Sequence, residues 1–438
     1  MKLIRRISRL DVVFLMLNAT IGGGIYGLPS QVFAKSGAYS LVAMLVCVVV
    51  IGLIILCFAE VGSRFSNTGG PLVYTHEAFG PFAGFMTGWL TLVLRIISMA
   101  AIANIAISYL GFFFPFAQTE LGRSVIISMV VIMLCYINYL GVRQSVLFNN
   151  IFTVGKLVTL LFFVVAGIFF IKADNFNFNV PLTYEAFSAS VLLMVFAFSG
   201  FAGAMAPTGE MKNPKKDIPF SLLTVLGFKT ILYLLIQVIC IGTLASLGSS
   251  QKPLTDAAAG FFPGWGGLFI TIGALISVIG TLNGSVLVVS RTCYGMAEKN
   301  LLPSFLAKVH PRYHTPHVAL LLTCSIMLLL TLTNTLLFLL TISALGQLFI
   351  YVVTCASLIK LREKKSIPAA AFILPAGKII AIISILFCLL IMTGSTLKEL
   401  LSIISVLAAG IVVYGIFILG KKKECNEKGN RKLISFED

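Results

Sequence analysis

Long apolar segments with few charges follow one another along almost the whole chain, and this feature constrains the fold more than any other. A helix needs about 20 apolar residues to cross a membrane. Twelve runs meet this requirement, near 11–34, 39–63, 80–114, 124–140, 147–171, 186–208, 219–246, 265–296, 316–334, 336–359, 370–393 and 398–420. Lipid offers no hydrogen bonds to a peptide backbone, so such segments fold as helices. We therefore predict an all-α polytopic membrane protein with about 12 transmembrane helices.

The charge distribution supports this class and predicts an orientation. Only 11% of the residues are charged, whereas soluble domains carry roughly 25%. The net charge of +16 is spread over many short loops, so we expect no nucleic-acid surface. Lysine and arginine concentrate in alternate loops, which predicts a cytoplasmic N-terminus (1–10) and a cytoplasmic basic tail (421–438). The N-terminal segment shows no small-residue cleavage site, and we expect the first span to be retained in a plasma or bacterial inner membrane.

Cysteine and histidine patterns indicate neither a cofactor nor an enzyme. The nine cysteines are isolated and form no CxxC pair, and the four histidines lie in or beside loops. Single cysteines in apolar spans resemble small buried hydrophobic residues. We predict no metal site, no cofactor and no catalytic residues.

Two of the apolar segments are interrupted by glycine at matching places. The first reads Asn18-Ala-Thr-Ile-Gly-Gly-Gly-Ile-Tyr-Gly-Leu-Pro29, and the second reads Phe196-Ala-Phe-Ser-Gly-Phe-Ala-Gly203. A broken membrane helix is tolerated only where it lines a cavity or is buried in protein. Interruptions at corresponding places in two halves indicate a transporter.

Five motifs carry a resemblance to the amino acid/polyamine/organocation (APC) superfamily. The glycine motif of the first span resembles that of the first helix in this family, and four further stretches agree in order: Gly69–Pro81, Glu210–Pro219, Gly280–Ala297, and Leu302-Pro303 with Thr315-Pro316. The resemblance implies a 5+5 inverted-repeat (APC/LeuT-type) fold. The first five-helix repeat would be 11–171, the inverted second repeat 186–359, and two additional helices 370–420.

The chemistry of the two breaks suggests an α-amino acid as substrate. A half-helix that begins at Ile21–Gly24 presents free N–H groups and a positive dipole end, which suit a carboxylate. We expect the carbonyls of Phe196, Ala197 and Phe198 to lack helical partners and to suit an ammonium group. The predicted substrate-binding residues are Ile21, Gly22, Gly23, Gly24, Phe196, Ala197, Phe198, Gly200 and Phe201. The alternative for the glycines is close helix packing, and Phe198, the lid aromatic by resemblance, could equally be ordinary core.

Lys156 is the predicted proton-coupling residue. The stretch Phe152-Thr-Val-Gly-Lys-Leu157 resembles a fifth-helix motif in which proton-coupled relatives place a lysine against the first helix. Desolvation disfavours a charged ammonium, so a buried lysine can bind and release a proton during a cycle. The alternative is a permanently charged lysine that holds the first helix, in a facilitator or an exchanger.

The other charges within the spans suggest gating and limit the substrate. Arg95 cannot deprotonate, so we predict a gating or structural ion pair, with Glu210, a carbonyl or an acidic group of the substrate as its partner. Glu60 and Glu210 are expected at the internal gate. Lys229 is expected to be structural and could extend to the cytoplasmic interface. Ala202 stands where many relatives carry an acid, so a neutral amino acid is favoured and an acidic one is possible.

These observations predict a transporter that imports an amino acid by alternating access, with proton symport. Spans 1, 2, 6 and 7 would rock against spans 3, 4, 8 and 9. The expected partners are the amino acid, protons and membrane lipids, with no nucleic acid and no obligate protein partner. Two alternatives remain, namely an uncoupled or exchange-type transporter of the same fold and a membrane receptor that binds amino acids without transport.

Overall fold

A computed structural model describes residues 8–65, 70–111, 113–140, 142–179, 181–205, 211–298, 301–313, 315–364 and 367–434. Within these ranges the chain is helical and contains no strand. Nine of the described segments are long and apolar enough to cross a membrane, and two shorter apolar helices accompany them. The predicted all-α polytopic fold is therefore confirmed.

Each predicted span coincides with a helix or with a pair of half-helices. In order these are α1 (Arg9–Thr20) with α2 (Gly24–Ser36), α3 (Ser40–Gly62), α5 (Pro81–Leu110), α6 (Glu120–Leu140), α7 (Val142–Gly167), α8 (Tyr184–Phe198) with α9 (Phe201–Ala204), α10 (Pro214–Thr243), α12 (Gly266–Glu298), α13 (His317–Thr333), α14 (Leu336–Glu363), α15 (Gly377–Met392) and α16 (Leu397–Ile434). Two further short helices are α4 (Pro71–Phe79) and α11 (Pro253–Phe261). The 3-10 turns are η1 (Gly37–Tyr39), η2 (Pro115–Gln118), η3 (Ile168–Phe170), η4 (Ala173–Asn175), η6 (Leu247–Ser249) and η7 (Ser304–Ala307).

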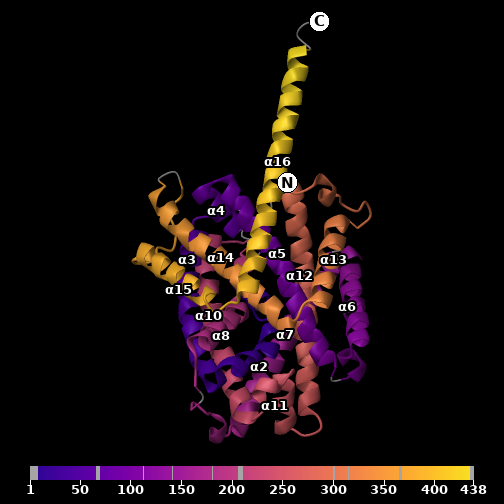
Figure 1. The fold of residues 1–438 in the computed structure, drawn as a ribbon, viewed down its shortest axis with the longest axis vertical. Helices are drawn as coiled ribbons and strands as arrows, with labels where there is room; N and C mark the ends of the chain where they lie inside the picture. The colour runs from indigo at the N-terminus through magenta and orange to yellow at the C-terminus, as the bar shows by residue number, and fades with distance from the viewer. Residues whose placement is uncertain are drawn as a thin grey trace.

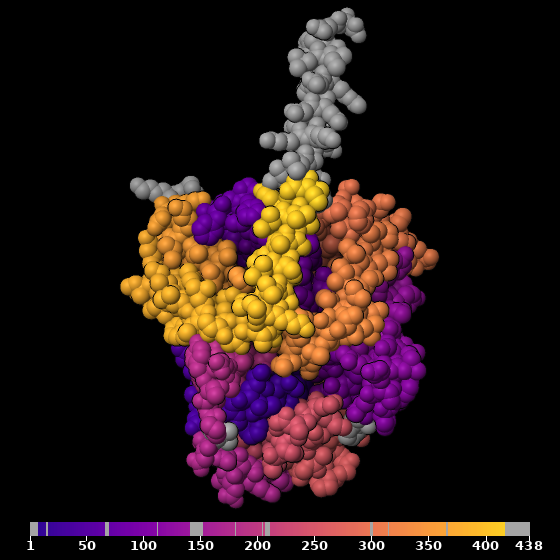
Figure 2. Space-filling view, in the orientation of Figure 1, coloured from indigo at the N-terminus to yellow at the C-terminus, as the bar shows by residue number. Residues whose placement is uncertain are grey.

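The helices form a bundle with distinct inner and outer members. In Figure 1, α4 lies at one end of the bundle and α11 at the other, while α16 crosses the outside. In the most apolar part of α5, 78% of the residues are buried, whereas in that of α16 only 11% are buried. Figure 2 shows α16 lying on the surface of the molecule. An outer helix that exposes apolar residues is suited to contact with lipid, so α5 belongs to the protein interior and α16 to the periphery.

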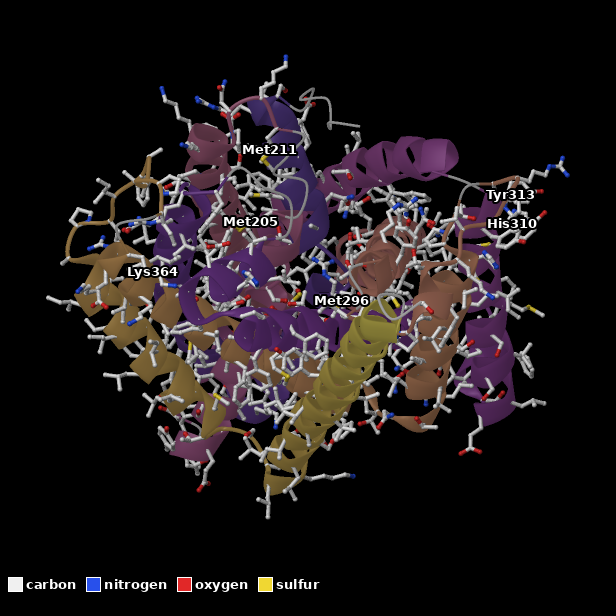
Figure 3. All side chains as sticks on the ribbon, turned by 90° about the horizontal axis from the view of Figure 1, so that it is seen from above. Met205, Met211, Met296, His310, Tyr313 and Lys364 are labelled. Carbon is white, nitrogen blue, oxygen red and sulfur yellow. The ribbon has the colours of Figure 1, made fainter. Side chains whose placement is uncertain are left out.

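Buried methionines occupy the interior near the end of the bundle that carries α4. Figure 3 looks onto this end and shows Met205 and Met296 toward the middle, with His310 and Lys364 on opposite sides. Met205 is completely buried, and Met296 is 3% exposed. Flexible, unbranched methionine side chains fill irregular space between helices. The interior at this end is therefore packed with apolar side chains.

Both helix interruptions occur where the sequence predicts them. The first separates α1 from α2 at Ile21–Gly23, and the second separates α8 from α9 at Ser199 and Gly200. Gly200 has a φ of +100°, which L-residues with a side chain rarely adopt. The glycine thus ends α8 and lets the chain restart as α9 in a new direction.

Candidate binding pocket between two broken helices

The two interruptions lie directly against each other. A Cβ atom added at Gly200 would lie 2.6 Å from the carbonyl oxygen of Ala19, in the last turn of α1. A Cβ atom at Gly24 would lie 3.1 Å from the ring of Phe196 in α8. The first approach requires the absence of a side chain, and the second leaves little room for one. Glycine therefore brings the backbones of the two broken helices into contact.

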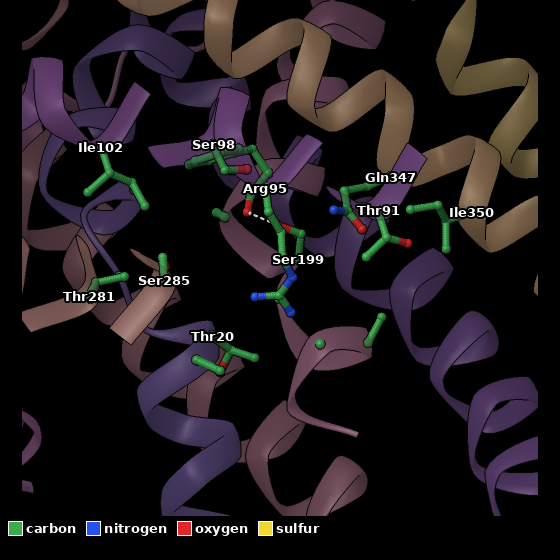
Figure 4. A pocket seen from close by; sticks show the side chains of 18 of the residues that line it. Thr20, Thr91, Arg95, Ser98, Ile102, Ser199, Thr281, Ser285, Gln347 and Ile350 are labelled. Atoms are coloured by element: carbon green, nitrogen blue, oxygen red, sulfur yellow. Dashed lines mark hydrogen bonds between the residues drawn. The ribbon is translucent and has the colours of Figure 1, made fainter. Parts of the chain in front are cut away.

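A cavity of about 90 Å³ opens beside this contact. A single water needs about 10–15 Å³ on such a measure, so the space admits a small solute. Figure 4 shows side chains from several helices converging on it. The lining residues are Ala19, Thr20, Gly22, Gly24, Thr91, Arg95, Ser98, Ile102, Phe196, Ala197, Ser199, Gly200, Ala202, Gly203, Tyr233, Thr281, Ser285, Gln347 and Ile350.

Free backbone N–H groups face the break on the α2 side. The N-cap residue of α2 is Gly23, which offers no side-chain hydrogen bond. The N–H of Tyr26 bonds to the carbonyl of Gly23 at 3.0 Å, while among the described residues no partner exists for the N–H groups of Gly22, Gly23 and Gly24. A helix start with unpaired N–H groups binds anions. This wall of the pocket is suited to a carboxylate.

Backbone carbonyls face the break on the α8 side, though one expected to be free is occupied. The carbonyl of Phe196 accepts hydrogen bonds from the N–H of Ser199 at 3.2 Å and from its hydroxyl at 2.8 Å. The prediction that this carbonyl is unpaired is therefore wrong, because Ser199 caps α8. The carbonyls of Ala197 and Phe198 accept no hydrogen bond from any described residue. Of these two residues only Ala197 lines the pocket, so its carbonyl remains for an ammonium group.

Lys156 holds the end of α1 from the side of α7. Its side chain is fully buried. The ammonium donates to the side-chain oxygen of Asn18 at 2.6 Å, to the carbonyl of Asn18 at 3.3 Å and to the carbonyl of Ile21 at 2.8 Å. An ammonium carries three N–H donors. All three are used on the last turn of α1 and the break that follows it.

Lys229 holds the same helix end from the side of α10. Its ammonium donates to the carbonyl of Thr20 at 2.8 Å and lies 5.3 Å from the ring centre of Phe198 and 5.1 Å from that of Tyr233. The residue is only 2% exposed. The expectation that Lys229 extends to the interface is therefore wrong, because an acceptor and two aromatic faces are available inside the protein.

Arg95 projects from α5 into the pocket. Figure 4 shows its guanidinium between Thr20 and Ser199. A Cβ atom at Gly203 would overlap the guanidinium, so the backbone of α9 lies directly against it. Within the described part of the chain, Arg95 forms no hydrogen bond and no ion pair. Its predicted partner Glu210 lies outside the described residues.

Comparison with known proteins identifies the family. The sequence model of a family described as "Amino acid permease" matches residues 7–419. The chain belongs to the amino acid permease family. This permease is 28% identical to the serine/threonine exchanger SteT of Bacillus subtilis, over 94% of its own length and 96% of that protein. It is 26% identical to the branched-chain amino acid permease BcaP of the same organism, with 94% and 93% covered. It is also 26% identical to the methylthioribose transporter of that organism, with 95% and 94% covered.

The pocket of the permease brings together most of the predicted backbone positions. Gly22, Gly24, Phe196, Ala197 and Gly200 line it. The carbonyl of Ile21 accepts a hydrogen bond from Lys156, and the side chain of Ile21 is fully buried. Gly23 faces other residues, because a Cβ atom there would lie 3.1 Å from Ile102 and 3.3 Å from Val278.

Two predicted aromatic residues lie outside the pocket of the permease. Phe198 packs against Tyr233 with ring centres 5.5 Å apart, and Phe201 stacks on Tyr351 at 5.2 Å. Phe196 lines the pocket instead. Because α8 stays helical to its last residue, side chains two positions apart point to nearly opposite sides. Phe196 is therefore the aromatic residue of α8 that lines the pocket, and Phe198 points away from the pocket.

Several polar lining residues were not predicted. Thr20, Ser199, Tyr233, Thr281 and Gln347 all line the pocket. Each is a polar residue within an apolar segment, and this pattern is the only indication in the sequence that such a residue could line a pocket. That signal does not give the rotation of a helix, so it does not separate residues that face a pocket from residues that bond within the bundle. Ser98 and Ser285 line the pocket as well.

A second and larger cavity lies next to the first. Its volume is about 380 Å³, and its lining includes Gly27, Asn104 and Arg123. Arg123 donates to the side-chain oxygen of Asn104 at 2.6 Å. Gly27 and Ile105 both line this cavity. A Cβ atom at Gly27 would lie 3.2 Å from Ile105, so α2 and α5 pack closely in the wall of this cavity.

Glu60 forms an ion-pair network at the end of α3. The carboxylate is fully buried and accepts from Arg64 at 3.0 Å, from Arg362 at 2.5 Å and from the N–H of Leu374 at 2.9 Å. Arg64 follows Glu60 by four residues, so this pair is local in sequence. Arg362 of α14 was not foreseen, because its contact with α3 depends on the packing of distant segments.

Proposed function

We propose that the permease carries an α-amino acid through the pocket between the two broken helices. The observation that supports this function is that Gly22 and Gly24, whose N–H groups have no described partner, line the same pocket as Ala197, whose carbonyl has no described donor. An α-amino acid carries a carboxylate and an ammonium group on one carbon. The α-carboxylate would bind at the start of α2, and the ammonium would bind at the end of α8.

Alternating access would expose this pocket to each side of the membrane in turn. The mobile bundle would consist of α1, α2, α3, α8, α9 and α10, and the scaffold of α5, α6, α12 and α13. The first repeat would cover 11–171 and the inverted repeat 186–359, each beginning with a broken helix. Alternate basic loops support cytoplasmic termini in a plasma or bacterial inner membrane.

Proton symport would use Lys156. Its three N–H donors meet three acceptors at the end of α1. A neutral amine keeps two N–H donors, so release of the proton would remove one bond between α7 and α1. Since α1 would belong to the mobile bundle and α7 lies beside it, binding and release of this proton would be coupled to the movement that opens the pocket.

Uptake into proteoliposomes tests this coupling. The wild type should accumulate a radiolabelled amino acid under an inward proton gradient, and Lys156→Met should lose the effect of the gradient. Lys229→Met is the matched control, because it removes a second buried ammonium from the same end of α1. Equal loss of gradient dependence in both variants, or its survival in Lys156→Met, would contradict the role of Lys156.

Exchange is the second candidate, because a relative with 28% identity is named a serine/threonine exchanger. An exchanger would take up labelled substrate only when unlabelled amino acid is present inside the vesicles. Its uptake would ignore the proton gradient. The same vesicles, loaded or empty, distinguish the two modes of transport.

A further inference from the structure

We propose that the permease selects amino acids with an acidic side chain and that Arg95 binds the side-chain carboxylate. This inference rests on the proposed function and names its substrate class. It starts from a guanidinium that lines the pocket and forms no hydrogen bond or ion pair within the described part of the chain.

The surroundings of the pocket are cationic. Arg95 lines it, and Lys156 and Lys229 lie directly behind the backbone of the first break. None of the described lining residues is acidic. Each lysine is bound to neutral carbonyl or amide oxygens rather than to a carboxylate. Desolvated positive charges without an anion are unfavourable, so the empty pocket is suited to a ligand with net negative charge.

Arg95 differs from the two lysines in what it can still bind. The hydrogen bonds of the lysines hold α1, whereas the five N–H donors of the guanidinium have no described acceptor. A guanidinium binds a carboxylate with two parallel hydrogen bonds. A side-chain carboxylate would supply such an acceptor, and the α-carboxylate would remain at Gly22–Gly24.

The buried acids elsewhere are already engaged. Glu60 pairs with Arg64 and Arg362, and Asp217 pairs with Arg9 at 2.9 Å. Neither carboxylate lines the pocket. Among the described residues, therefore, no acid is available to neutralise Arg95 from within the protein.

The unpaired guanidinium of Arg95 distinguishes between the two substrate classes that the sequence leaves open, neutral and acidic amino acids. The absence of an acid at Ala202 argues against dibasic amino acids and favours a neutral or an acidic one. A neutral amino acid would leave the guanidinium unpaired in the loaded pocket. An acidic amino acid would carry two carboxylates for the two donor sites and one ammonium for the carbonyl of Ala197.

Competition between acids and their amides tests the proposal. Proteoliposomes would be offered labelled aspartate, glutamate, asparagine and glutamine, which differ in charge but hardly in size. We expect the wild type to prefer each acid over its amide at least tenfold in apparent affinity. Arg95→Gln should lose that preference, and Arg95→Lys should keep part of it. Gly227→Ala, which lies outside the pocket, should retain it.

Three results would overturn the proposal. The wild type could prefer the amides, Arg95→Gln could still prefer the acids, or the double variant Arg95→Gln with Glu210→Gln could restore the activity that Arg95→Gln loses. The last result would make Glu210 the partner of the guanidinium. Failure of the proposed function itself looks different, because no amino acid of the panel would then enter the vesicles.

Discussion

Gly200→Ala should destabilise the permease more than an alanine at any open glycine position. Gly200 combines a φ of +100° with a close approach of α1, where a Cβ atom would lie 2.6 Å from the carbonyl oxygen of Ala19. The oxygen belongs to the backbone, so it cannot rotate away as the end of a side chain could. Alanine at this position must therefore move α1 away from the second break.

The magnitude follows from two contributions. A side chain in the left-handed region costs about 1–2 kcal/mol, and forced overpacking in a well-packed interior costs about 1–3 kcal/mol. Together they lower the free energy of unfolding by about 2–5 kcal/mol. Because Ala19 and Gly200 both line the pocket, substrate affinity should fall as well, by tenfold for each 1.4 kcal/mol that reaches the bound state.

Equilibrium unfolding in mixed detergent micelles measures the first effect, and substrate binding to the purified protein measures the second. Gly227→Ala is the matched control, because no atom lies within 4 Å of a Cβ atom there. Gly227 is a helical residue of α10, so alanine should be neutral or stabilising by up to about 1 kcal/mol. Wild-type stability and affinity in Gly200→Ala would refute the close contact between the two breaks.

Three further changes test separate parts of the structure. Glu60→Gln should lower the free energy of unfolding by about 2–4 kcal/mol, because it removes the charge partner of Arg64 and Arg362, whose side chains are only 10% and 21% exposed. Asp217→Asn, whose arginine partner is 49% exposed, should cost less than about 1 kcal/mol; equal losses on chemical denaturation would contradict this ranking. Lys229→Met should lower the free energy of unfolding by about 1–3 kcal/mol, because the carbonyl of Thr20 keeps only the longer bond from the Tyr233 hydroxyl at 3.5 Å, and an unchanged unfolding midpoint would refute the bond. Gly203→Ala should displace the guanidinium of Arg95 and reduce substrate affinity at least tenfold, and wild-type binding would show that this contact is absent.

The positions of the spans and of the two breaks could be predicted because they depend on local chemistry. Runs of apolar residues require helices in lipid, and glycine triplets such as Gly22–Gly24 leave a helix without side chains to pack. The contact of Lys156 with the first helix matches its expected place, although its role in proton coupling remains a proposal.

Other features depend on helix rotation and on distant packing. Whether Phe196 or Phe198 faces the pocket depends on where α8 ends. Ser199 caps α8 by donating to the carbonyl of Phe196, which was expected to be free. Lys229 lies inside because Thr20 and two aromatic rings meet its ammonium, and none of these is a sequence neighbour. Such partners follow from tertiary structure rather than from a local pattern.

A structure of the purified permease with its bound amino acid, determined by electron cryo-microscopy, tests the central claim most directly. We predict substrate density between the two breaks, with the α-carboxylate at the N–H groups of Gly22 and Gly24 and the ammonium near the carbonyl of Ala197. Density confined to the larger cavity beside Asn104, or a substrate whose carboxylate points away from α2, would contradict the account.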